Sequence, residues 1–112
     1  MDRFPDDETG DALRKFEANG FDLSNVMKVD FFVAIPSEES GKKVASKARY
    51  LGYEVSVEQD KVTGEWTCYC NKKMIPNYDN FIKSESELDK IGKEYGGYID
   101  GFGSYGNIWI KL

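Results

Sequence analysis

The segment VMKVDFFVAI, residues 26–35, decides how the rest of the chain is arranged. Most of its residues are β-branched or aromatic, which is the composition of a β-strand. Residues 31–35 are apolar without interruption, and such a run indicates a strand that is covered on both sides. We therefore expect residues 26–35 to form a central strand of a sheet, which Pro36 ends.

The residues after Pro36 alternate between helical and extended patterns. Ser37 is a favourable N-cap, and it precedes an apolar stripe at helical spacing. That stripe consists of Val44, Ala45, Ala48 and Leu51. The further elements that we expect are strands at 53–58 and 65–74, a helix at 77–95, and extended chain from Tyr98 with a last strand at 108–112. The pattern leaves open whether residues 98–112 form one bent strand or a hairpin.

A further helix is expected ahead of the central strand. Pro5 and the acids after it are typical of a helix start, and Asn19-Gly20 favours a helix end. Without this helix the order is β-α-β-β-α-β, which predicts an α+β, ferredoxin-like sandwich. Its antiparallel sheet would carry two helices on one face. We expect a single domain over residues 1–112, with 1–24 as a helical extension and 25–112 as the core.

The chain is acidic, with 20 acids against 15 bases and a net charge of −5. Acidic proteins repel phosphate backbones, so we expect no direct binding to nucleic acid or to an anionic membrane. An acidic surface is better suited to a basic protein partner. The first 25 residues carry much of the charge, including Asp6, Asp7, Glu8 and Asp11. These four acids either start a helix or contact a partner; they lack the alternation of a calcium loop.

The sequence lacks the side chains that most often drive catalysis. It contains no histidine, which removes the commonest general base and most zinc or copper sites. The spacing of Cys68 and Cys70 does not suit a zinc knuckle, so both are expected in the core. We therefore predict no catalytic residue, no metal and no cofactor. The absence of a signal peptide pattern and of long apolar stretches favours a cytoplasmic location.

The segment EYGGYIDGFGSY, residues 94–105, is the most unusual part of the sequence. Its four glycines indicate close backbone approach or a bulge. It is not a phosphate-binding loop, because no lysine or serine follows the glycines in the required positions. Asp100 could brace a turn by accepting backbone hydrogen bonds, or it could bind a partner.

Several segments together resemble one known family. They are residues 4–24 (FPDDETGDALRKFEANGFDLS), 29–32 (VDFF), 52–55 (GYEV) and 97–103 (GYIDGFG). They are similar to the regulator of ribonuclease activity B family, whose members are called ribonuclease E inhibitors. The resemblance implies a ferredoxin-like fold and a non-enzymatic role. It also implies a protein partner, with an endoribonuclease as the candidate.

Our first functional hypothesis is a binding module that modulates such a partner through an acidic and aromatic surface. The predicted contact residues are Asp6, Asp7, Glu8, Asp11, Tyr98, Asp100, Phe102 and Tyr105. Two alternatives remain: an immunity-type or other small interaction protein, and an enzyme or small-ligand binder with a pocket near Asp100. Base stacking on sheet aromatics is disfavoured by the charge. The partner's identity and the oligomeric state are left open.

Overall fold

The computed structural model describes residues 6–18, 20, 25–104 and 109–111. Within these residues it contains three helices and one antiparallel sheet of five strands, which confirms the α+β class. The elements in chain order are α1 (Glu8–Ala18), β1 (Met27–Ile35), α2 (Glu38–Tyr50), β2 (Glu54–Gln59), β3 (Trp66–Met74), α3 (Tyr78–Glu94), β4 (Tyr98–Ser104) and β5 (Trp109–Lys111). No helix in this described part of the chain is both long and apolar enough to span a bilayer.

The strand at residues 27–35 lies at the centre of the sheet. The strand order is β2-β3-β1-β4-β5, so β1 pairs with β3 on one side and with β4 on the other. The prediction of a central strand is therefore confirmed. β4 and β5 are separate antiparallel strands, with Phe102 opposite Ile110, which answers the question that the sequence left open.

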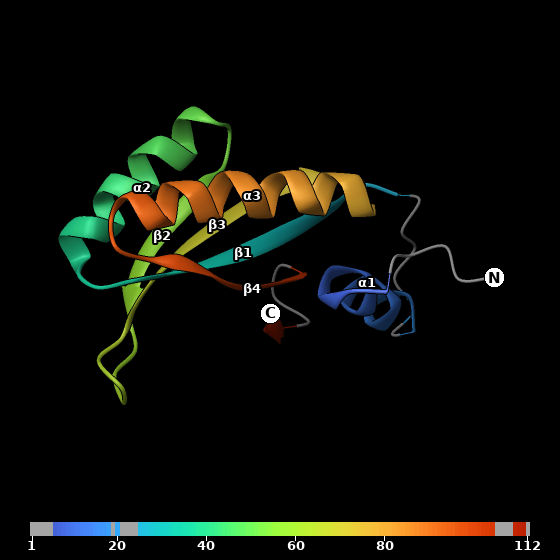
Figure 1. The fold of residues 1–112 in the computed structure, drawn as a ribbon, viewed down its shortest axis with the longest axis horizontal. Coiled ribbons are helices and arrows are strands. Elements are labelled where there is room, and N and C mark those ends of the chain that lie inside the picture. The colour runs from blue at the N-terminus through green and yellow to red at the C-terminus, as the bar shows by residue number, and fades with distance from the viewer. Residues whose placement is uncertain (1–5, 19, 21–24, 105–108, 112) are drawn as a thin grey trace.

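Helices α2 and α3 cover one face of the sheet, and α1 lies near one end of it (Figure 1). Side-chain oxygens cap the two covering helices: Ser37 accepts from the Ser40 N–H, and Asn77 accepts from the Asn80 N–H. The β2–β3 hairpin extends beyond the sheet on the side away from the helices (Figure 1). We call the helix-free side of the sheet the open face.

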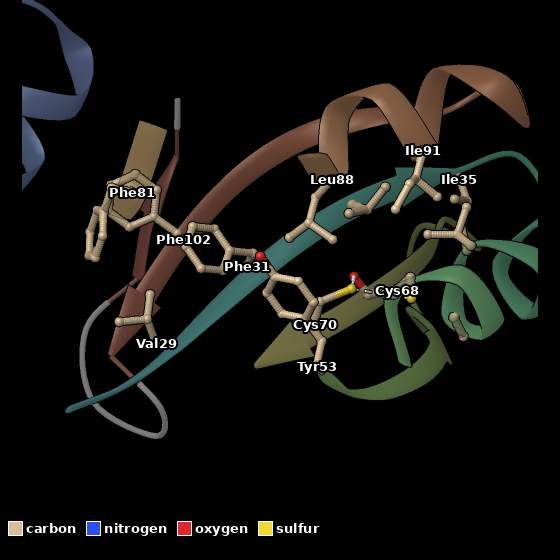
Figure 2. Close-up of a cluster of buried hydrophobic side chains, with 14 of the residues drawn as sticks. Val29, Phe31, Ile35, Tyr53, Cys68, Cys70, Phe81, Leu88, Ile91 and Phe102 are labelled. Carbon is tan, nitrogen blue, oxygen red and sulfur yellow. Dashed lines mark hydrogen bonds between the residues drawn. The ribbon is translucent and has the colours of Figure 1, made fainter. Parts of the chain in front are cut away.

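The core between the sheet and the helices contains a cluster of phenylalanine rings. Phe31 of β1, Phe81 of α3 and Phe102 of β4 point toward one another in Figure 2. The ring centroids of Phe81 and Phe102 are 4.8 Å apart, in the edge-to-face geometry that aromatic pairs prefer. Phe16 of α1 joins this cluster, at 6.1 Å from Phe81. Phe16 is fully buried, and its contacts pack α1 against the core.

Two further expectations concern the inward-facing residues. Cys68 and Cys70 are buried free thiols in the core, as predicted (Figure 2). Leu51, by contrast, is 38% exposed, so its predicted place on the inner stripe of α2 is wrong. Leu51 is the C-cap of this helix, and the chain turns there before it can follow the helical period.

Strand β4 contains a bulge at Asp100. Gly101 pairs with Phe32 and Ile99 pairs with Val33, so Asp100 is an additional residue with no partner position on β1. A bulge of this kind bends a strand and changes the direction of its side chains. The glycine-rich segment thus places Asp100 at an irregular point of the sheet, as its composition suggested.

Candidate protein-binding surface

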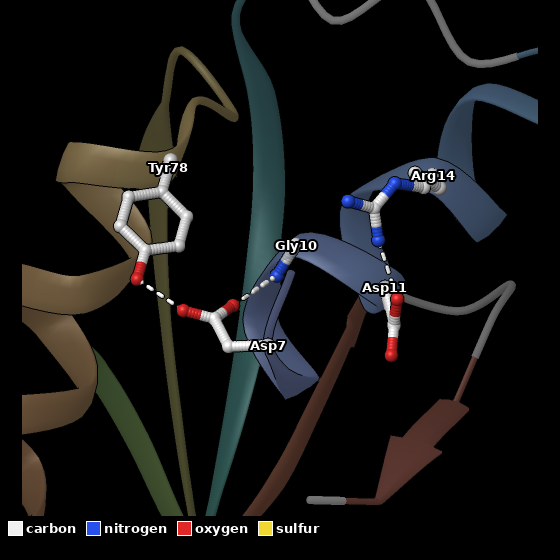
Figure 3. Close-up of polar contacts among 5 residues, drawn as sticks. All are labelled: Asp7, Gly10, Asp11, Arg14 and Tyr78. Atoms are coloured by element: carbon white, nitrogen blue, oxygen red, sulfur yellow. Dashed lines mark hydrogen bonds and ion pairs between the residues drawn. The ribbon is translucent and has the colours of Figure 1, made fainter. Parts of the chain in front are cut away.

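Asp7 lies at the N-terminal end of α1 and has a structural role there. One carboxylate oxygen accepts a hydrogen bond from the Gly10 N–H at 2.8 Å, as an N-cap does. The other accepts a hydrogen bond from the hydroxyl of Tyr78, the first residue of α3 (Figure 3). The Tyr78 bond and then the Gly10 bond lower the pKa of Asp7. Asp7 therefore links α1 to α3.

The other predicted acids near this end are arranged differently. Asp6 and Asp11 are exposed, and Asp11 forms an ion pair with Arg14 (Figure 3). Glu8 is the first residue of α1. Thr9, which is buried, donates a hydrogen bond to Glu85 of α3 at 3.0 Å. Asp6 and Asp11 thus remain on the surface, where they could meet a basic partner.

Tyr98 and Asp100 lie far from these acids. Asp7 contacts Tyr78, the first residue of α3. Tyr98 instead follows the other end of this helix. There the Gly97 N–H donates a hydrogen bond to the Gly92 carbonyl oxygen at 2.7 Å. Tyr78 and Gly92 are fourteen residue steps apart along the helix, which corresponds to roughly 20 Å. The structure therefore divides the predicted contact residues between two ends of the domain.

Tyr98 and Asp100 line the same cavity, of about 460 Å³. We call it the hairpin cavity, because one wall is the β2–β3 hairpin. Its lining comes from three separate parts of the chain: residues 34–36, residues 63–67, and Gly96, Tyr98 and Asp100. Ala34 lies between Thr67 on β3 and Tyr98 on β4, and its small side chain leaves space between these neighbours.

Two further predicted contact residues are Phe102 and Tyr105. Phe102 is fully buried on the helix-covered side, opposite Phe31, so its prediction as a surface contact is wrong. The bulge at Asp100 shifts the alternation along β4, so Phe102 lies on the same side as Ile99 and not on the side of Tyr98. Tyr105 lies outside the described residues.

The open face carries a buried polar pair that sequence reasoning missed. Asp30 and Asn71 are paired across β1 and β3, and they are 7% and 9% exposed. One side-chain oxygen of each has no hydrogen-bond partner. Burial, with a smaller effect of Glu58, raises the pKa of Asp30 to about 6, and Lys28 partly opposes this. The surrounding apolar run in β1 gave no sign of a buried acid.

No group of three or more acidic or cysteine side chains in the described part of the chain gathers closely enough to hold a metal ion. Catalysis by two carboxylates would need both near one substrate atom. Glu65 and Asp100 both line the hairpin cavity, which makes it the place to test for a ligand.

Comparison with known families decides which kind of protein this is. Residues 6–104 match the model of the family described as regulator of ribonuclease activity B. The chain belongs to this family. The resemblance noted in the sequence is thereby confirmed over nearly the whole chain. A comparison with curated proteins gave no significant match. Within the regulator of ribonuclease activity B match lie both α1 with its acids and every residue of the hairpin cavity.

Proposed function

We propose that this chain regulates a ribonuclease by binding it as a protein, without catalysing a reaction itself. The observation that carries the proposal is membership of the regulator of ribonuclease activity B family over residues 6–104. The net charge of −5 and the lack of histidine support a binding role. A charged surface of one sign increases the rate of encounter with a partner of the opposite sign.

We place the contact surface at the hairpin cavity and on the exposed acids of α1. Tyr98 is 53% exposed, and aromatic residues in such positions supply much of the binding energy of protein interfaces. Asp6 and Asp11 are exposed at the other end of the domain. Acids steer a basic partner, and Tyr98 would anchor it. The same reasoning favours an endoribonuclease with a basic segment, located with this chain in the cytoplasm.

We also assign the core to the ferredoxin-like type, with α1 as an addition to a single domain. The succession β1-α2-β2-β3-α3-β4 and the strand order β2-β3-β1-β4 support this assignment. In this topology each helix connects two strands that flank a third. The open face of the sheet is then free of helices, and the hairpin cavity lies at the end of the sheet where β1 ends and β3 and β4 begin.

The test is an RNA cleavage assay with the endoribonuclease of the same cell. The purified chain should lower the cleavage rate of the full-length enzyme in a saturable way, and should itself cleave no RNA. Binding should weaken as salt rises from 50 to about 500 mM, because exposed charges are screened over roughly 4 Å at such ionic strength. An unchanged cleavage rate together with no binding at either salt concentration would remove the proposal.

A second candidate function, a small-ligand binder, is favoured by one observation. The hairpin cavity has a volume in the range of ligand sites, about 300 to 1,000 Å³, and Asp100 lines it. Thermal melting in the presence of metabolite mixtures would reveal such a ligand, since binding to the folded state raises the melting temperature. A ligand that raises the melting temperature of the wild type but not of Asp100→Asn would support this alternative.

A further inference from the structure

We propose that the hairpin cavity receives an arginine side chain of the regulated protein. The inference rests on the proposed function and makes it more specific, because it names the chemical group that the partner must present. It depends on three properties of the cavity: its charge, the exposed ring of Tyr98, and the small side chain of Ala34 beside that ring.

The charge of the cavity favours a cation. Glu65 and Asp100 are among its eleven lining residues, and none of the eleven is a lysine or an arginine. The chain as a whole carries 15 basic residues, so their absence here is a local property. A guanidinium group entering the cavity would meet carboxylates with which it can form charge-assisted hydrogen bonds.

The walls of the cavity include aromatic residues. Trp66 lies on β3 and Tyr98 lies on β4, and the end of β1 runs between these strands. Neighbouring strands are about 4.8 Å apart, so β3 and β4 are separated by roughly 10 Å across Ala34. Trp66 pairs with Ile35, which belongs to the core, whereas Tyr98 pairs with Ala34 and is 53% exposed. The ring of Tyr98 is therefore the aromatic face against which a planar guanidinium can lie.

These features favour arginine over lysine. A guanidinium is planar, is weakly hydrated and presents several donors in a fixed fork, whereas an ammonium is a compact, strongly hydrated charge. Asp100, the bulged residue of β4, lines the cavity together with Tyr98.

A second cavity on the molecule differs from the hairpin cavity in the charge of its lining. It lies between α2 and α3 and has a volume of about 680 Å³. Its charged lining residues are balanced: Lys47 and Lys90 against Glu87 and Glu94. Lys47 and Glu94 already form an ion pair at 2.8 Å. This second cavity therefore has no preference for a cation, although it is larger.

The test uses the full chain labelled with ¹⁵N and three small probes. The probes are N-acetyl-arginine methylamide, its lysine equivalent and the neutral citrulline equivalent. We expect saturable shifts of the Trp66 indole and Tyr98 amide resonances with the arginine probe. Binding should be at least about tenfold weaker for the other two, because citrulline has no charge and an ammonium lacks the planar fork of donors, and the loss of one such bond accounts for that factor. Equal binding of the citrulline or lysine probe would overturn the assignment.

Variants locate the effect. Glu65→Gln changes an exposed residue and should fold normally. We compare this single variant with the double variant Glu65→Gln/Asp100→Asn. Both should weaken arginine-probe binding, the double variant more. Glu54→Gln is the control, because Glu54 of β2 is also exposed and does not line the cavity. Equal weakening by the control would assign the effect to overall charge and contradict the proposal.

The same variants separate this inference from the proposed function. If wild type and Glu65→Gln/Asp100→Asn inhibit the ribonuclease equally, the cavity proposal fails and the regulatory function stands. If the wild type binds the arginine probe but does not affect the ribonuclease, the proposed function fails and the cavity retains its preference for guanidinium.

Discussion

Asp30 and Asn71 lie directly opposite each other on β1 and β3, and each holds a buried side-chain oxygen without a hydrogen-bond partner. A carboxylate oxygen and an amide oxygen are both acceptors and cannot bond to one another. Protonation of Asp30 would convert one of these acceptors into a donor. This relationship gives the domain a stability that depends on pH.

The first prediction concerns that dependence. Asp30 titrates near 3.8 in an unfolded chain, and burial raises its pKa to about 6 in the folded protein. The folded state therefore binds the proton more tightly, so the stabilisation is complete below pH 3.8 and is lost as pH rises through 6. The free energy of unfolding of the wild type should fall by up to about 3 kcal/mol relative to Asp30→Asn over this interval. Parallel profiles from urea denaturation at several pH values would contradict this expectation.

The second prediction concerns the attachment of α1. Asp7→Ala removes both the N-cap and the contact with Tyr78, and should lower the melting temperature by about 5 °C. Asp7→Asn keeps a good N-cap and should lower it less. Tyr78→Phe removes only the contact between the helices. Thermal melting of the three variants and of Asp7→Ala/Tyr78→Phe tests whether the two residues act together; strictly additive changes would show that they do not.

The third prediction distinguishes a core phenylalanine from a surface tyrosine. Phe102 is fully buried among Phe16, Phe31 and Phe81, so Phe102→Ala should cost about 3 to 5 kcal/mol. Tyr98 is half exposed, and Tyr98→Ala should change stability by only about 0.5 kcal/mol. Among the molecules that remain folded, Tyr98→Ala should weaken ribonuclease binding more than Phe102→Ala does. Chemical denaturation and titration of the folded variants measure the two effects, and a well-tolerated Phe102→Ala would conflict with the core packing.

The fourth prediction concerns Gly97, which precedes β4. A Cβ atom there would lie 2.2 Å from the carbonyl oxygen of Ala34, so the backbone of β1 or β4 would have to move. Gly97→Ala should therefore destabilise the domain by more than about 2 kcal/mol and disturb the hairpin cavity. Gly20→Ala is the control: Gly20 has a positive φ of 89° but nothing within 4 Å of the added atom. Its cost should be only about 1 kcal/mol, measured by the same denaturation experiment.

The sequence predicted the elements better than it predicted their contacts. The central strand was evident from its unbroken apolar run, and the helix expected at 77–95 is observed as α3 with Asn77 and Tyr95 as its caps. These features depend on neighbouring residues, which a single sequence displays. Phe102 was misplaced because regular alternation puts residues 98, 100 and 102 on one face, whereas the bulge at Asp100 moves Phe102 to the other face.

The hairpin cavity could not be found in the same way. Its lining residues come from segments some thirty positions apart, and only the strand order β3-β1-β4 brings them together. Glu65 and Trp66 carried no local pattern that connected them to Asp100. The buried state of Asp30 likewise follows from its partners across the sheet.

The distance between the two ends of α3 has a consequence for the partner's length. A polypeptide that reached from Asp7 to Tyr98 would have to cover roughly 20 Å, which takes at least about six residues in extended form. Two modest contacts joined by such a stretch would reinforce each other by avidity. Shortening that stretch in the ribonuclease would then reduce affinity sharply, even with every contacting side chain kept.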